Sequence, residues 1–593
     1  MTIFSFVLYF SVLTLSRLFL FLVCTMALGV NIPVFSQHHH HLKTRLPEEF
    51  SAHQPTILPV LTSDGKRLYF DRKNYAENIG GVRDFDDIWF ADLLPNGAWA
   101  KPQNLGAPLN TEGSDVLCSL SPDDRWGLVY GVYDRELPLK NQGFSLTRFK
   151  EGAWAFPQPI RIENFYNRTK KYYARLAPDN RTLLLALQRD ESLGGLDLYV
   201  SFRKDTSLQW SEPLHLGKTV NTSAYEGSPH LAPDGKTLYF SSEGHGGSGV
   251  ADLFVTRRLD DSWQRWTTPV NLGSMINTSE EDSSIDVALD GRTAYFLSSD
   301  SAGKKGLYKA VLPDSLKHEG AVLLFGKVSV EKNLGNNSAN NLANNRDKTA
   351  RKNNLRNKGE REENAIPQFG QKTGIRPTGE ENVVLTGYTA IANTTSAGYM
   401  RPEIQSFAET TLNESRYAMT LPAGSVYIVM AQMSDMTPSP SWLGIVDARK
   451  PDFPAESRLE RREQPIVLSL QSSSPFVFPP LYCVQEQATL RPESASLPAL
   501  IAFAYKTLTE KAPEVRERLK VEVVGHTCDL GTKEENEILG QERAEAVAAA
   551  LELHGIPHEA ITIRTEGERQ PLSRSALEES RAVNRRVEVR IRW

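Results

Sequence analysis

The stretch VEVVGHTCDLGTKEENEILGQERA, residues 521–544, holds residue types that could do chemistry. Cys528 follows a β-branched run, and His526 stands two residues before it. The thiol could be a nucleophile, a metal ligand, a free thiol or half of a disulfide. A catalytic cysteine needs a base that a third group orients, and no orienting group is evident for His526. A structural zinc ion needs four ligands, more than Cys483, Cys528 and His526 supply. We therefore predict no catalytic residue and no metal site.

A second candidate is Arg543, on a helix predicted from about residue 533 to 554. Asn536, Leu539 and Arg543 stand at i, i+3 and i+7, so they share one helical face. The residues four positions to either side of Arg543 are apolar, and a guanidinium among them needs an anion. That anion is either part of a ligand or an internal carboxylate such as Asp529.

The elements that must position these residues form an α/β pattern. A helix is predicted over residues 494–515, and the strand LKVEVVGHT (519–527) follows it. The segment 584–593, NRRVEVRIRW, alternates with period 2, as expected for a half-buried strand. Its apolar face would consist of Val587, Val589, Ile591 and Trp593.

Several segments occur in a family-specific order: LYCVQEQATLRPES (481–494), VEVVGHT (521–527), ERAEAV (542–547), GIP (555–557), EGERQP (566–571) and NRRVEV (584–589). Through them, residues 475–593 resemble the peptidoglycan-binding C-terminal domain of the OmpA family. The resemblance implies that the domain binds the diaminopimelate of the stem peptide and needs no cofactor. Arg543 would bind the carboxylate, and an acid after Gly-His-Thr would bind the ammonium group. The peptidoglycan-binding positions would be Thr527, Asp529, Asn536, Leu539, Arg543 and Arg586.

The sequence departs from the family at the acid. The position directly after Gly-His-Thr is Cys528, and the carboxylate stands one residue later, at Asp529. A neutral thiol cannot replace the charge, so Asp529 would have to reach the site from the loop. The resemblance also places Cys483 beside Cys528. Because an exported protein meets an oxidising compartment, we predict a Cys483–Cys528 disulfide.

A repeated unit fills residues 42–318. Five variants of one turn-and-strand motif, among them SDGKRLYF (63–70) and APDGKTLYFSS (232–242), contain aspartates at regular intervals of 55 to 59 residues: Asp64, Asp123, Asp179, Asp234 and Asp290. Each unit shows about four short strands, which predicts an all-β propeller of about five blades. The motif resembles the PD40-like repeats of the TolB propeller family. No Gly-x-Ser-x-Gly follows the repeats, so a hydrolase domain is not predicted.

Residues 319–470 show alternating strand patterns that resemble the small β-sandwich of carboxypeptidase-regulatory-like domains. An asparagine-rich insertion at 332–378 has few large apolar residues and is predicted to be disordered. At the other end of the chain, residues 1–36 are predicted to be a signal peptide, with an uncleaved membrane anchor as the alternative.

The formal net charge of -5, from 67 basic and 72 acidic residues, does not favour nucleic acid as a partner. Together the parts predict a non-enzymatic envelope protein in the periplasm of a diderm bacterium, associated with the outer membrane and cell wall. Its partners would be peptidoglycan and, through the propeller, envelope or secretion proteins. The domain order resembles PorE-type envelope proteins. The alternative is a docking or sensing scaffold whose OmpA-like domain binds no glycan.

Overall fold

The architecture comes from a computed structural model. It describes residues 43–330 except 51–57, 136–140 and 205–207; residues 383–468 except 395–399, 412–415, 434–440, 450–457 and 465; and residues 476–592 except 512. The predicted signal peptide, the asparagine-rich insertion and Trp593 lie outside these residues. Within them, no helix is both long enough and apolar enough to cross a membrane.

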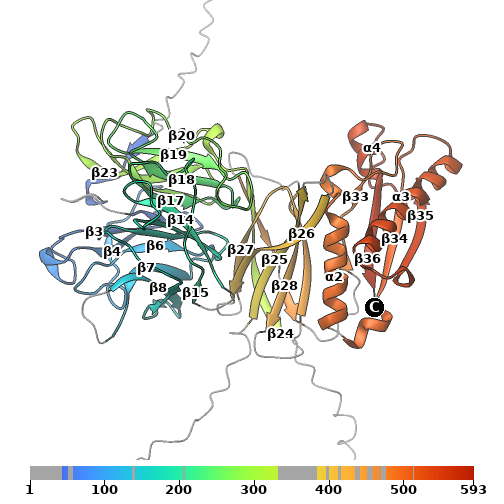
Figure 1. Ribbon diagram of the computed structural model, residues 1–593, viewed down its shortest axis with the longest axis horizontal. Coiled ribbons are helices and arrows are strands. Elements are labelled where there is room, and N and C mark those ends of the chain that lie inside the picture. Colours follow the sequence, from blue (N-terminus) through green and yellow to red (C-terminus); the bar gives the residue numbers. More distant parts are fainter. Residues whose placement is uncertain are drawn as a thin grey trace, which may run out of the picture. The chain divides into compact units, whose positions relative to one another are not determined.

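The repeat region forms five antiparallel sheets within the described residues, coloured blue to green in Figure 1. The first contains β2 (Val60–Leu61), β3 (Arg67–Arg72), β4 (Asp87–Asp92) and β5 (Gln103–Asn104). The second contains β6 (Leu117–Leu120), β7 (Trp126–Val132), β8 (Asn141–Lys150), β9 (Ala153–Trp154) and β10 (Gln158–Pro159). The third contains β12 (Tyr173–Leu176), β13 (Thr182–Leu187), β14 (Asp197–Phe202) and β16 (Leu214–His215). The fourth contains β17 (Glu226–Leu231), β18 (Thr237–Ser242), β19 (Asp252–Arg257) and β20 (Val270–Asn271).

The fifth sheet combines strands from the two ends of the repeat region. Its consecutive strands are β21 (Ser283–Val287), β22 (Thr293–Ser299) and β23 (Lys305–Val311), and β1 (Lys43–Arg45) pairs antiparallel with β23. A separate parallel pair joins β11 (Arg161–Ile162) to β15 (Gln209–Trp210).

The regular aspartates have one structural role. In every repeat the Asp Oδ1 accepts a hydrogen bond from the backbone N–H two residues later, at 2.8 to 3.2 Å. The residue between them has a positive φ, which favours glycine, asparagine or aspartate. The five residues at this position are Gly65, Asp124, Asn180, Gly235 and Gly291. The sequence period therefore reflects one side-chain-stabilised turn, repeated between the first two strands of each sheet.

The first strands of neighbouring sheets contact one another, β2 with β6, β6 with β12, β12 with β17, and β17 with β21. The first and fifth sheets are connected as well, because the Leu61 backbone N–H donates to Asp286 Oδ2 at 2.6 Å. The radial arrangement of a propeller stays a prediction.

Residues 321–468 contain two further sheets. One contains β24 (Ala321–Val330), β27 (Arg416–Pro422), β30 (Leu459–Glu463) and β31 (Ile466–Leu468). The other contains β25 (Val383–Thr394), β26 (Met400–Thr411), β28 (Val426–Met433) and β29 (Ser441–Asp447). The segment Leu-Pro-Ala-Gly (421–424) makes the turn from β27 into β28, with Gly424 at φ +94°. The regulatory-like sandwich stays a prediction.

The C-terminal part of the chain is an α/β domain. Its sheet has the order β32 (Phe476–Val477), β36 (Arg586–Arg592), β34 (Lys520–His526) and β35 (Ile561–Gly567), and β33 (Leu481–Tyr482) also pairs with β36. The helices are α2 (Leu497–Lys511), α3 (Lys533–Leu553) and α4 (Glu578–Asn584). The described residues also include short 3-10 helices at Glu48–Phe50, Gly81–Arg83, Asp314–Leu316, Pro492–Ser494, Pro513–Arg518 and His558–Ala560.

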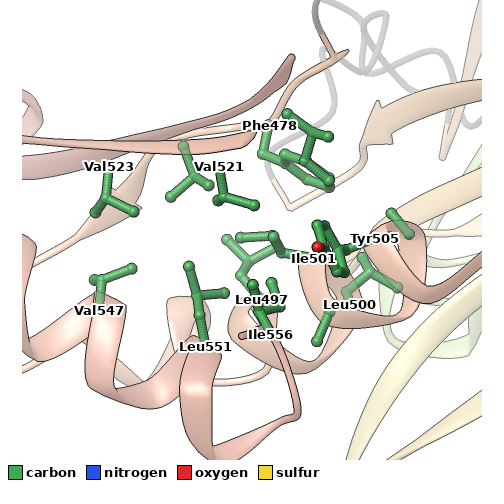
Figure 2. Close-up of a cluster of buried hydrophobic side chains, with 14 of the residues drawn as sticks. Phe478, Leu497, Leu500, Ile501, Tyr505, Val521, Val523, Val547, Leu551 and Ile556 are labelled. Carbon is green, nitrogen blue, oxygen red and sulfur yellow. The ribbon is translucent and has the colours of Figure 1, made fainter. Parts of the chain in front are cut away.

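The core of this domain lies between the sheet and two helices. Figure 2 shows Val521 and Val523 of β34 directed toward Val547 and Leu551 of α3, with the apolar face of α2 beside them. All four of these side chains are fully buried. The predicted helical and strand periodicities are confirmed here, because the residues expected to face inward do so. On β36, Val587, Val589 and Ile591 are likewise buried.

Candidate functional site

The candidate site begins where β34 ends, next to the N-terminal half of α3. A capping box starts α3, in which the Thr532 side chain accepts from the Glu535 backbone N–H and Glu535 accepts from the Thr532 backbone N–H. Strand and helix approach closely at two glycines. A Cβ on Gly525 would lie 1.8 Å from the Gly540 carbonyl oxygen. This close packing places the residues after His526 against the buried face of α3.

Arg543 lies on that buried face, with 1% of its surface exposed. Its guanidinium donates to three backbone carbonyl oxygens, of Gln487 (2.9 Å), His526 (3.0 Å) and Val484 (3.1 Å). Burial lowers the pKa of Arg543. Among the described residues no carboxylate pairs with Arg543, and the three carbonyl oxygens accept from its guanidinium instead. A guanidinium has five N–H donors, so two are not used by these bonds.

Asp529 does not pair with Arg543. It is exposed, and its carboxylate accepts from Arg581 Nε at 2.8 Å and Nη2 at 3.3 Å. This ion pair holds the pKa of Asp529 below its usual range. Of the two anions considered for Arg543, an internal Asp529 carboxylate is therefore not the partner in this structure. The reason is that Asp529 has turned outward into the loop, toward α4.

Cys528 and Cys483 are both buried and both free. The predicted disulfide is not formed in this structure. Both sulfur atoms lie close enough to Arg543 to influence its pKa. The guanidinium is therefore near both thiols. Burial raises the pKa of Cys483 to about 11, so this thiol is neutral at physiological pH.

The other predicted binding positions are buried or half-buried. Thr527 is 2% exposed, and its Oγ1 has no hydrogen-bond partner. Asn536 is buried and donates to Glu568 Oε2 at 2.8 Å, while Leu539 is half-buried. Arg586 is buried but pairs with Glu588 at 2.7 Å and donates to the Gln570 carbonyl oxygen at 3.1 Å. Arg586 thus has partners for Nε and Nη2, while its buried Nη1 has no hydrogen-bond partner.

Sequence analysis missed Arg585. It is 3% exposed, forms an ion pair with Glu578 through Nη2, and leaves Nε and Nη1 without a hydrogen-bond partner. Its guanidinium lies beside the Cys528 thiol and is near enough to Arg543 to lower the pKa of that arginine. A signal was present. By strand alternation, Arg585 belongs to the same face as Val587, and a charge at such a position needs a special partner.

His526 is also buried at this edge of the sheet. Neither ring nitrogen has a hydrogen-bond partner, and Nε2 lies 3.7 Å from Glu588 Oε1. Burial, together with the charge of Arg586, lowers the pKa of His526 to about 4. The imidazole is therefore neutral at physiological pH.

These contacts describe a buried cationic cluster, made of Arg543, Arg585 and Cys528, and the buried Thr527 directly precedes Cys528 in the chain. Unpartnered buried donors cost free energy, and an anion would satisfy them. A carboxylate fits this cluster best, since a guanidinium can bind it with two N–H groups. Within the described residues, no base is oriented toward a side chain that could act as a nucleophile in this cluster. The described residues also contain no cluster of metal-ligating side chains.

Residues 491–585 match the family model of the OmpA family. The chain is 42% identical over 71 residues to outer membrane porin F of Pseudomonas fluorescens, covering 12% of this chain and 22% of that protein. It is 38% identical over 69 residues to the peptidoglycan-associated lipoprotein of Legionella pneumophila, covering 12% of this chain and 39% of the relative. It is 32% identical over 102 residues to the probable lipoprotein YiaD of Escherichia coli K12, covering 17% and 43%.

The chain thus spans less than half the length of each of these relatives. Among solved structures, the peptidoglycan-associated lipoprotein from Burkholderia pseudomallei is 26% identical, with a TM-score of 0.17, covering 19% of this chain and 89% of that one. The match to the family model, with the α/β fold described above, identifies the C-terminal part of this chain as an OmpA-family domain.

Proposed function

We propose that this protein is a non-enzymatic component of a diderm cell envelope. Its OmpA-family domain binds peptidoglycan in the periplasm, in association with the outer membrane and cell wall. The observation that carries the proposal is the buried cationic cluster with unpartnered donors on Arg585. The similarity to proteins named peptidoglycan-associated lipoproteins supports it.

The chemistry of the stem peptide fits the cluster. Diaminopimelate offers a carboxylate, which would accept from the free Nε and Nη1 of Arg585 and from the remaining N–H groups of Arg543. Thr527 Oγ1 would donate to the same carboxylate or to a neighbouring peptide group. Binding would thus replace missing hydrogen bonds rather than break existing ones.

The ammonium end of diaminopimelate has a weaker site. Cys528 stands where the family has its acid, and Asp529 is neutralised by Arg581. Asp529 would have to release Arg581 before it could bind an ammonium group. We therefore expect this domain to bind mainly the carboxylate end.

The same proposal covers the N-terminal sheets. Five sheets whose first strands contact one another in sequence, with Leu61 hydrogen-bonded to Asp286 between the first and the fifth, support a five-bladed propeller. Arg175 of the third sheet forms a buried ion pair with Asp286 of the fifth, as expected for strands that line a common axis. The propeller would present surfaces to envelope or secretion proteins, and residues 319–470 would form the sandwich between the two ends.

The test is sedimentation of the full chain with purified peptidoglycan, with free diaminopimelate as competitor. Arg585→Gln should reduce the bound fraction about tenfold or more, the loss expected for a charge-assisted hydrogen bond. Arg574→Gln, an exposed arginine of the same domain, is the matched control and should bind like the unchanged protein. Thermal unfolding of each variant shows whether the domain remains folded.

One observation favours a second candidate function. Three of the five N–H groups of Arg543 donate to backbone carbonyl oxygens, as in an arginine with a structural role. If the folded Arg585→Gln protein sediments normally, or if the unchanged protein does not sediment, the domain is instead a docking or sensing scaffold that binds no glycan.

A further inference from the structure

A cavity of about 530 Å³ lies in the repeat region and has no part in the function proposed above. It lies at the N-terminal ends of β6 and β12, next to Leu58 just before β2, and thus joins the first three sheets. Loop residues between β3 and β4 form one side of it. Its volume is within the range of about 300–1,000 Å³ that is typical of ligand sites.

Aromatic rings form much of its wall. Tyr130 and Tyr172 stack with their ring centroids 4.4 Å apart and their planes 27° apart. Phe85 also lines the cavity and is 60% exposed, an unusual exposure for a phenylalanine. Such a wall favours a planar or large aliphatic group, which would bury the Phe85 ring.

The charged groups of the cavity are three lysines and one aspartate: Lys73, Lys170, Lys171 and Asp86. Lys170 and Lys171 are exposed, and within the described part of the chain neither ammonium group forms an ion pair. The excess of positive charge favours a ligand with a carboxylate. An exposed pair of adjacent lysines can approach such a group from the rim.

Asp86 is the acidic group of the cavity. It is 5% exposed, and its Oδ2 accepts from Ser114 Oγ at 2.8 Å, but its buried Oδ1 has no hydrogen-bond partner. Burial raises the pKa of Asp86 to about 6, so the group is still mostly ionised at pH 7.5. A buried carboxylate oxygen without a donor is costly, and a ligand N–H would satisfy it.

We propose that this cavity binds the C-terminal end of a peptide whose last residue is aromatic or large and aliphatic. Lys170 and Lys171 bind the terminal carboxylate, and Asp86 Oδ1 accepts the N–H of the terminal peptide bond. The last side chain packs between Phe85 and the Tyr130–Tyr172 pair. A peptide end combines a carboxylate, a nearby N–H donor and an apolar side chain, the three groups that this cavity favours. The repeat region would thus recognise a partner protein by its last residues.

The experiment measures fluorescence anisotropy with the full chain and a fluorescein-labelled hexapeptide, Gly-Ser-Gly-Ser-Gly-Phe, with a free carboxylate. The same peptide as a C-terminal amide, and one that ends in glycine, are the comparison probes. The amide should bind about tenfold more weakly, as expected for loss of a charge-assisted contact. The double variant Lys170→Met/Lys171→Met should weaken the acid peptide to the level of the amide and leave the amide unchanged.

Two further variants keep the proposal falsifiable. Lys218→Met removes an exposed lysine outside the cavity and should change nothing. Phe85→Ser alters an exposed side chain and should reduce the preference for the phenylalanine peptide over the glycine peptide. The proposal is overturned if the unchanged protein binds the acid and the amide peptide equally well. It is also overturned if peptides ending in phenylalanine, tyrosine, leucine and valine all fail to bind.

3-Phenylpropionate lacks the amide N–H that Asp86 would accept, so it should bind more weakly than the hexapeptide. If it binds as tightly, the ligand is a small aromatic carboxylate and the proposal is overturned. Sedimentation with peptidoglycan is measured on the same variants. It should not change, so failure of the peptide site is distinguishable from failure of the envelope-binding proposal.

Discussion

Replacing Arg543 with methionine should destabilise the OmpA-family domain. Methionine fills most of the buried volume of the arginine stem but cannot donate to the carbonyl oxygens of Gln487, His526 and Val484. A hydrogen bond to a charged group contributes about 1.5–3 kcal/mol, so the three bonds give about 4.5–9 kcal/mol before other effects are subtracted. Two effects reduce this loss. Val484 O keeps a bond from the Gln487 backbone N–H at 3.3 Å, and the cost of burying a charge disappears. We expect a loss of about 2–3 kcal/mol in the free energy of unfolding.

Urea denaturation of residues 475–593, followed by circular dichroism at 222 nm, reports on α2 and α3. Arg543→Lys should lie between methionine and arginine, because one ammonium group cannot reach all three carbonyl oxygens. Arg574→Gln, which is exposed, should change stability by no more than about 0.5 kcal/mol. A loss below about 1 kcal/mol for Arg543→Met would contradict the view that Arg543 connects the loop at residues 484–487 to the end of β34.

Three other outcomes are expected. Cys528→Asp places a carboxylate beside Arg543 and Arg585, where it can bind the ammonium group of the stem peptide. Affinity for peptidoglycan should rise about tenfold. Sedimentation equal to or weaker than that of the unchanged protein would contradict this role of residue 528. Alkylation under denaturing conditions without reductant, followed by peptide mapping, should find both Cys483 and Cys528 modified, whereas a bridged pair would leave both unmodified. The folded pKa of His526, about 4, lies below its unfolded value near 6.5, so the contribution of neutral His526 to stability should be complete above pH 6.5 and lost as the pH falls toward 4. His526→Gln should flatten this part of the plot of unfolding free energy against pH. An unchanged plot would refute the assignment.

Elements with a local signal were predictable from the sequence. The helix expected over 533–554 is observed as Lys533–Leu553, because its capping box and its apolar face are both encoded within it. The aspartates at intervals of 55 to 59 residues likewise mark a turn that each repeat stabilises with its own side chain. Such features depend on neighbours within a few residues, so periodicity reveals them.

The partners of the site residues were not predictable in this way. Arg543 is bonded to carbonyl oxygens of residues 56 and 59 positions away, which no helical pattern encodes. Asp529 pairs with Arg581, 52 residues away, because the loop after Thr527 turns its side chain outward. Arg585 could have been found from strand alternation. Its orphaned donors, however, depend on how α3 and β36 pack, and that packing is known only from the structure.

The three-residue strand β1 has a mechanical consequence. It is the edge strand of the fifth sheet, paired with β23. Lys43 Nζ donates to the Ile276 carbonyl oxygen at 2.8 Å and lies 4.7 Å from the centre of the Tyr308 ring. Arg45 donates to the Lys305 carbonyl oxygen at 3.0 Å. If the OmpA-family domain holds the wall as proposed, tension applied to the residues before Lys43 would act first on this strand. Because β1 is so short, it would detach before any longer strand, exposing the edge of β23. Loss of β1 would leave the fifth sheet with three consecutive strands, while the strand pairings within the other four sheets do not involve β1.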